Sequence, residues 1–80
     1  MRIKREVPGF IKDNIKKLGV KISKIRINKN FSQEKLAYRS GIAKSFLGYI
    51  ERGMANPTVE TLYLIADGLD ISLNELVDLD

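Results

Sequence analysis

Residues 33–52, QEKLAYRSGIAKSFLGYIER, contain the pattern that decides the fold. Their apolar residues recur where two short helices joined by a tight turn must touch, at Leu36, Ala37, Ile42, Leu47 and Ile50. The spacing predicts helices over residues 33–40 and 44–52, with Gly41 where the chain has to reverse. The polar residues left on the second helix then share one outward face: Lys44, Ser45 and Tyr49.

The segment before this pair of helices has the apolar period of a longer helix, at Ile11, Ile15, Leu18, Ile22 and Ile25. Lysines line the other side: Lys12, Lys16, Lys17, Lys21 and Lys24. We expect this helix to start between residues 11 and 14, where Asp13 could cap it, and to run to roughly Lys29. Pro8 and Gly9 break any earlier element, so residues 1–9 are predicted to be a flexible basic arm.

Three hydroxyl residues stand just before helical patterns and are expected to be N-caps: Ser32, Thr58 and Ser72. Asn30 stands where a left-handed residue commonly closes a helix. Thr58 would open a fourth helix and Ser72 a short fifth one. The sequence therefore predicts an all-α fold of five helices without a strand, in which residues 10–80 form a single domain.

Charge is divided between the two parts of the chain. Residues 1–53 contain all 14 Lys and Arg and only four acids, a balance of +10, whereas residues 54–80 contain six acids and no base. A basic region of this size suits a polyanion, and the acidic part would be kept away from the same polyanion. An ordinary solvated surface accounts for the net charge of +4 but not for its segregation.

The composition excludes several kinds of catalytic and metal-binding site. With no His and no Cys, the chain offers no imidazole base, no thiolate nucleophile, no zinc site of the usual type and no disulfide. We therefore expect no enzyme activity, no metal and no cofactor. The basic start is not followed by an apolar stretch, and no apolar run is long enough to span a bilayer. We expect a soluble protein of the cytoplasm, without a membrane partner.

The chain resembles the lambda-repressor-like DNA-binding proteins of the Cro/CI type, also called the XRE family. The matching segments cover about residues 18–76 and are LGVKISKIR, FSQEKLAYRSGI, KSFLGYIERG, NPTVETLYLIADGL and ISLNEL. Agreement along so much of the chain is more specific than one short motif. The resemblance implies a lambda-repressor-like fold in which helices 2 and 3 form a helix-turn-helix and helix 3, the recognition helix, enters the major groove of DNA.

Carried onto this sequence, the family pattern places three side chains at positions that contact base edges: Lys44, Ser45 and Tyr49. A Lys ammonium can donate to guanine, a Ser hydroxyl can donate or accept, and a Tyr ring can pack on a thymine methyl group. Other interpretations remain for two of them. Lys44 could only neutralise a phosphate, and Tyr49 could pack on Lys44 or Ala43.

The same resemblance implies contacts with phosphates, which position a protein without specifying sequence, at Gln33, Arg39, Arg52 and Asn56. Gln33 opens helix 2, where its amide and the free backbone N–H groups can both bind a phosphate oxygen. Each of the others could instead be solvated. The arm residues could follow a narrow minor groove, although disordered basic ends are common: Arg2, Lys4 and Arg5.

Three further positions concern how helix 3 is held. The family pattern implies that Arg26 of helix 1 pairs with Glu51 of helix 3, which would fix the orientation of the recognition helix. Ala43 stands where the family often has Ser or Thr, so a side-chain cap worth about 1 kcal/mol is lost. Gly48 lies inside the helix and costs up to about 1 kcal/mol. It either lets the backbone come close to DNA or is a tolerated defect.

One recognition helix reads only a few base pairs, so useful specificity normally needs two copies about 34 Å apart. We therefore expect a homodimer and a palindromic or pseudo-palindromic operator. The candidate interface is the last segment, whose apolar residues exceed what one short helix needs for its core contact: Leu69, Ile71, Leu73, Leu76, Val77 and Leu79. Alternatively, all six belong to the core.

These observations predict a sequence-specific transcriptional regulator that binds double-stranded DNA, and the resemblance includes phage-type repressors and restriction-modification controller proteins. The main alternative is an antitoxin or another protein-interaction module with autoregulatory DNA binding. Nothing in the sequence indicates a small-molecule ligand. Non-specific RNA binding is a further possibility, but the sequence shows no aromatic stacking platform.

Overall fold

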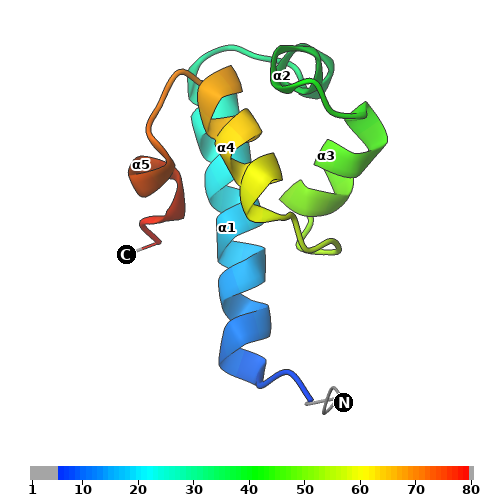
Figure 1. Ribbon diagram of the computed structural model, residues 1–80, viewed down its shortest axis with the longest axis vertical. Coiled ribbons are helices and arrows are strands. Elements are labelled where there is room, and N and C mark those ends of the chain that lie inside the picture. Colours follow the sequence, from blue (N-terminus) through cyan, green and yellow to red (C-terminus); the bar gives the residue numbers. More distant parts are fainter. Residues whose placement is uncertain (1–5, 80) are drawn as a thin grey trace.

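The computed structural model describes residues 6–79. Within that range the chain forms five α-helices and no strand: α1 (Gly9–Asn28), α2 (Gln33–Ser40), α3 (Lys44–Glu51), α4 (Val59–Gly68) and α5 (Leu73–Val77). Figure 1 shows α1 along the length of the molecule, with α2 and α3 to one side and α5 to the other. No helix in this range is long and apolar enough to cross a membrane. The predicted arm contacts lie outside the described residues: Arg2, Lys4 and Arg5.

The predicted start of α1 was wrong. The helix begins at Gly9, and Pro8 is its N-cap, with φ −60° and ψ 152°. The carbonyl of Pro8 accepts hydrogen bonds from the N–H groups of Ile11 and Lys12, at 3.1 and 3.3 Å. Proline has a fixed φ close to the helical value and no N–H to leave unpaired, so it opens this helix instead of excluding one. Asp13 consequently lies inside the helix and does not cap it.

The predicted hydroxyl caps are present. Each accepts a hydrogen bond from the backbone N–H three residues later: Ser32 from Lys35 at 3.0 Å, Thr58 from Thr61 at 3.1 Å and Ser72 from Glu75 at 3.1 Å. Asn30 and Gly41 have left-handed φ values of 61° and 70°, so the turns on either side of α2 close as expected. These local signals therefore predict both ends of α2 correctly.

Every helix contributes to one core, whose buried members are Ile22, Leu36, Ala37, Leu47, Ile50, Ile65, Ala66, Leu69 and Leu76. Leu69 and Leu76 have no exposed surface. These two residues of the predicted dimer interface therefore lie in the core. Leu69 is the C-cap of α4, and Leu76 belongs to α5, which packs against both α1 and α4. Val59 and Tyr63 share the helical spacing of α4, yet they are 64% and 59% exposed.

Gly19 sets how closely α1 and α3 approach. A Cβ atom at this position would lie 2.7 Å from the backbone oxygen of Glu51, closer than two such atoms can come. Because glycine has no Cβ, the last turn of α3 can rest directly on α1. The orientation of the recognition helix therefore depends on the absence of a side chain at Gly19.

Candidate nucleic-acid interface

The recognition helix α3 has one buried face and one exposed face. Leu47 and Ile50 point into the core, with 0% and 1% of their surface exposed. The opposite face exposes the three residues predicted to contact bases: Lys44, Ser45 and Tyr49. A shallow depression on this side is lined by the same three residues with Gln33, Gly48 and Arg52. The structure thus brings together most of the predicted DNA contacts on one surface.

The start of α3 has no side-chain cap. Ala43 is the N-cap, with φ −68° and ψ 140°, and its methyl group cannot accept a hydrogen bond from the first turn. The predicted loss of a cap at this position is confirmed. The N–H groups that remain there add positive potential beside Lys44, at an end of the helix where anions are favoured.

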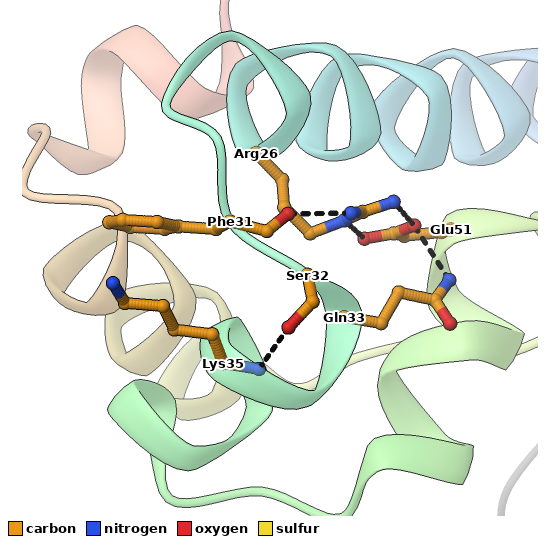
Figure 2. Close-up of polar contacts among 6 residues, drawn as sticks. All are labelled: Arg26, Phe31, Ser32, Gln33, Lys35 and Glu51. Carbon is orange, nitrogen blue, oxygen red and sulfur yellow. Dashed lines mark hydrogen bonds and ion pairs between the residues drawn. The ribbon is translucent and has the colours of Figure 1, made fainter.

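Arg26 and Glu51 join α1 to α3 through a largely buried ion pair (Figure 2). Arg26 Nε donates to Glu51 Oε2 at 2.8 Å, and Nη2 donates to Oε1 at 3.1 Å. The two side chains are 12% and 5% exposed. The remaining nitrogen, Nη1, donates to the carbonyl of Phe31 at 2.8 Å. The contact implied by the family pattern is therefore bidentate, and it also fixes the turn before α2.

Gln33 extends this network to α2. Its Nε2 donates to Glu51 Oε1 at 2.9 Å, so one carboxylate receives hydrogen bonds from both Arg26 and Gln33 (Figure 2). Arg26, Gln33 and Glu51 are named the brace below. Sequence reasoning assigned Gln33 to a phosphate and missed this bond. A side-chain amide has two N–H donors, and the brace uses one of them.

Arg39 lies apart from the surface beside α3. Its Nε donates to the carbonyl of Gly68 at 2.6 Å, and its guanidinium carbon lies 4.9 Å from the centroid of the Phe31 ring. The first contact satisfies a carbonyl at the C-terminal end of α4, where a cation is favoured. Arg39 therefore holds α2 against α4, a role that no local pattern indicated.

Arg52 covers part of the exposed face of α3. Its guanidinium carbon lies 5.0 Å from the centroid of the Tyr49 ring. A Cβ atom at Gly48 would lie 3.3 Å from Arg52 Nη1 and 3.9 Å from Gln33 Oε1. Gly48 is buried beneath these two side chains, so its small size makes room for Arg52. Neither interpretation of Gly48 from the sequence included this contact.

A short α2, a left-handed turn at Gly41 and a recognition helix with one exposed polar face define a helix-turn-helix protein. Residues 22–76 match the family described as helix-turn-helix. The chain belongs to this family, of the Cro/CI (XRE) type, whose members are DNA-binding regulators of transcription. The resemblance predicted from the sequence is confirmed.

Similarity to individual proteins and solved structures supports this assignment. The chain is 42% identical over 65 residues to the uncharacterized HTH-type transcriptional regulator y4dJ of Sinorhizobium fredii, which covers 81% of this chain and 84% of that one. The crystal structure of the restriction-modification controller protein C.AhdI from Aeromonas hydrophila has a TM-score of 0.76 and 38% identity, over 80% of this chain and 96% of that one. The C.Esp1396I controller tetramer in complex with its natural 35 base-pair operator has a TM-score of 0.71 and 34% identity, over 80% and 93% of the two chains.

Proposed function

We propose that this protein binds a palindromic or pseudo-palindromic operator as a dimer and regulates transcription from it. The observation that carries the proposal is the exposed polar face of α3, which the brace holds against the body of the domain. The exposed side chains of that face meet base edges in the major groove: Lys44, Ser45 and Tyr49. The protein acts in the cytoplasm by occupying DNA, without a catalytic step, a cofactor or a small-molecule ligand.

Phosphate contacts flank the base-reading face. Gln33 can donate to a phosphate with the second N–H of its amide, the one that does not bond Glu51. The first backbone N–H groups of α2 lie beside it. Arg52 and Asn56 supply a charge and an amide at the other end of α3. Arg39 would have to release the carbonyl of Gly68 to reach a phosphate, so we assign it a smaller contribution.

The dimer forms through the last segment and the neighbouring α4. Four apolar residues of the predicted interface keep exposed surface: Ile71, Leu73, Val77 and Leu79. Val77 is 43% exposed, and α4, which packs against α5, adds Tyr63 at 59% and Leu64 at 40%. Large apolar side chains exposed together on a small domain mark surfaces that bind protein. Residues 54–80, which supply this surface, contain six acids and no base, although Leu79 borders lysines of α1. The acids keep α4 and α5 away from the DNA backbone.

Occupancy of the operator provides the regulation. A dimer carries two copies of α3, and half-sites about 10 base pairs apart place both copies on the same face of the duplex. A dimer that covers a promoter excludes RNA polymerase. One that lies just upstream of it recruits the polymerase instead.

Selection of bound duplexes from a random pool tests the proposal most directly. We expect one enriched motif with two-fold symmetry and half-sites separated by about one helical turn. Lys44→Ala should relax the preference at a base position in each half-site, whereas Gln33→Ala should weaken binding evenly across sequences. The melting temperature of Gln33→Ala is measured as well, because this substitution removes one hydrogen bond of the brace. A pool without enrichment, and no binding to any duplex at low salt, would refute the proposal.

A further inference from the structure

The part of α1 before Gly19 has no role in the proposed function. The family match begins at residue 22, whereas α1 begins at Gly9, so residues 9–21 of the helix precede the matched region. In Figure 1 this part of α1 extends past the other helices, beyond the loop that follows α3. It contains four lysines and one acid, Asp13. None of residues 9–17 belongs to the hydrophobic core or packs against it.

Lys16 is where this part of α1 meets the loop after the recognition helix. Gly53 in that loop has φ 72°, and a Cβ atom there would lie 2.7 Å from Lys16 Cγ and 3.0 Å from Lys16 Cα. The aliphatic stem of Lys16 is thus packed against the loop, while the residue as a whole is exposed. Lysine commonly buries its stem in this way and leaves its ammonium in water. Packing therefore limits where the charge of Lys16 can lie relative to α3.

A groove runs between α1 and this loop. Apolar side chains line part of it, from Ile15, Met54 and Ala55, and exposed polar side chains line the rest, from Lys12, Lys16 and Asn56. Lys12 and Lys16 are one helical turn apart, about 6 Å along the axis, so they project from the same side of α1. The groove therefore reaches Gly53, the residue after the C-cap Arg52 of α3, and is cationic along its α1 side.

We propose that Lys12 and Lys16 bind DNA phosphates flanking the operator, so that α1 lengthens the footprint of each monomer. The inference rests on the proposed function, because it assigns this groove to the same duplex. Continuity favours DNA as the occupant, since the groove includes Asn56, a proposed phosphate contact, in the loop that follows Arg52. Charge favours it too, because residues 53–58 of the loop contain no acid to oppose a phosphate.

The spacing of the two lysines fits a duplex backbone. B-DNA carries one phosphate per about 3.4 Å of axis on each strand, so two charges about 6 Å apart can serve two phosphates of one strand. Such contacts add affinity without sequence preference, and they make binding more sensitive to salt. The proposal therefore predicts an effect on salt dependence and on the flanks, with no effect on the selected motif.

Two double variants of the full chain test this inference. Lys12→Gln/Lys16→Gln removes both charges of the groove but keeps much of the stem that packs on Gly53. The control, Lys17→Gln/Lys24→Gln, removes the same charge from the same helix, outside the first groove. These residues border a second groove with Lys16 and with Leu79 of the proposed dimer interface, so sedimentation equilibrium establishes that the control still dimerises. The probe is a duplex that carries the selected operator with flanks of about 10 base pairs, titrated between about 50 and about 200 mM salt.

We expect the plot of log affinity against log salt to be shallower for Lys12→Gln/Lys16→Gln than for the wild type by about 3.6, because each phosphate contact contributes about 0.9 and the dimer loses two contacts in each monomer. Over that fourfold salt range the difference corresponds to roughly 150-fold in the affinity of the dimer. The control should keep the wild-type slope. Trimming the flanks should abolish the difference between the wild type and the groove variant.

Equal slopes for the groove variant and the control would overturn the inference and leave the proposed function intact. If the wild type bound no duplex at all, both the inference and the proposed function would be refuted. Thermal melts establish whether the variants are folded. If Lys16→Gln unfolds the protein through its contact with Gly53, the single variant Lys12→Gln should still lower the slope by about 1.8, one contact per monomer, and an unchanged slope would overturn the inference.

Discussion

Replacing Arg26 with alanine should destabilise the protein strongly, because it removes the centre of the brace. Arg26 gives two hydrogen bonds to Glu51 and one to the carbonyl of Phe31. Without it, the carboxylate of Glu51, whose side chain is 5% exposed in the intact pair, keeps only the amide of Gln33 as its side-chain donor. Breaking a buried ion pair from one side costs about 3–5 kcal/mol, since the other charge is left uncompensated.

The expected loss lies at the lower end of that range. Arg26 is 12% exposed, so water can reach the site once the guanidinium is gone. We expect the free energy of unfolding to fall by about 3 kcal/mol, out of a total of roughly 5–15 kcal/mol for a domain. For a chain of this size the melting temperature should drop by about 12–24 °C.

Urea denaturation followed by circular dichroism measures this change. Lys24→Ala is the matched control, since Lys24 is exposed on the same helix and also loses one positive charge. The double variant Arg26→Met/Glu51→Leu should recover most of the loss, because a buried pair can be replaced by apolar side chains at little cost.

Equal stabilities for Arg26→Ala and Lys24→Ala would refute the reasoning about the brace. A double variant as unstable as Arg26→Ala would instead assign the loss to packing, and not to an uncompensated carboxylate.

Three further sets of substitutions test the packing and the dimer. Gly19→Ala should destabilise the protein by about 2 kcal/mol or more, because α1 and α3 must separate, whereas Gly9→Ala, with no atom within 4 Å of the new Cβ, should be neutral or mildly stabilising in thermal melts. Gly48→Ala should raise the free energy of unfolding by up to about 1 kcal/mol, because the atom nearest to the new Cβ is the end of the flexible Arg52 side chain. Operator affinity should stay within about a factor of two, and a tenfold loss would indicate close approach of this position to DNA instead. Val77→Ser and Tyr63→Ser should each shift sedimentation equilibrium toward the monomer, while Ile27→Ser, on the exposed side of α1, should not; a wild-type profile for both would move the interface elsewhere.

The sequence was sufficient to predict features that depend on near neighbours. A cap such as Ser32 bonds a residue three positions away, and a left-handed closure such as Asn30 involves the adjacent turn, so both can be recognised locally. The two faces of α3 follow from the helical period in the same way. The predicted start of α1 is wrong because Pro and Gly are common helix breakers, as at Pro8 and Gly9, although proline also opens helices.

Features that depend on distant contacts were not predictable from local patterns. The bond from Arg39 to the carbonyl of Gly68 joins residues 29 apart, and the bond from Gln33 to Glu51 joins residues 18 apart. Apolar spacing does not indicate which partner a long polar side chain will find. For the same reason Leu76 was assigned to an interface, although two other helices enclose it in the folded chain.

Arg26, Gln33 and Glu51 belong to one chain, so the orientation of α3 is set before any encounter with an operator. Association then needs no folding step, and its heat-capacity change should reflect the buried contact area alone, without the larger value of coupled ordering. The on-rate should be limited by electrostatically guided diffusion. The response of the regulated promoter should therefore follow changes in the concentration of the protein without a delay from folding.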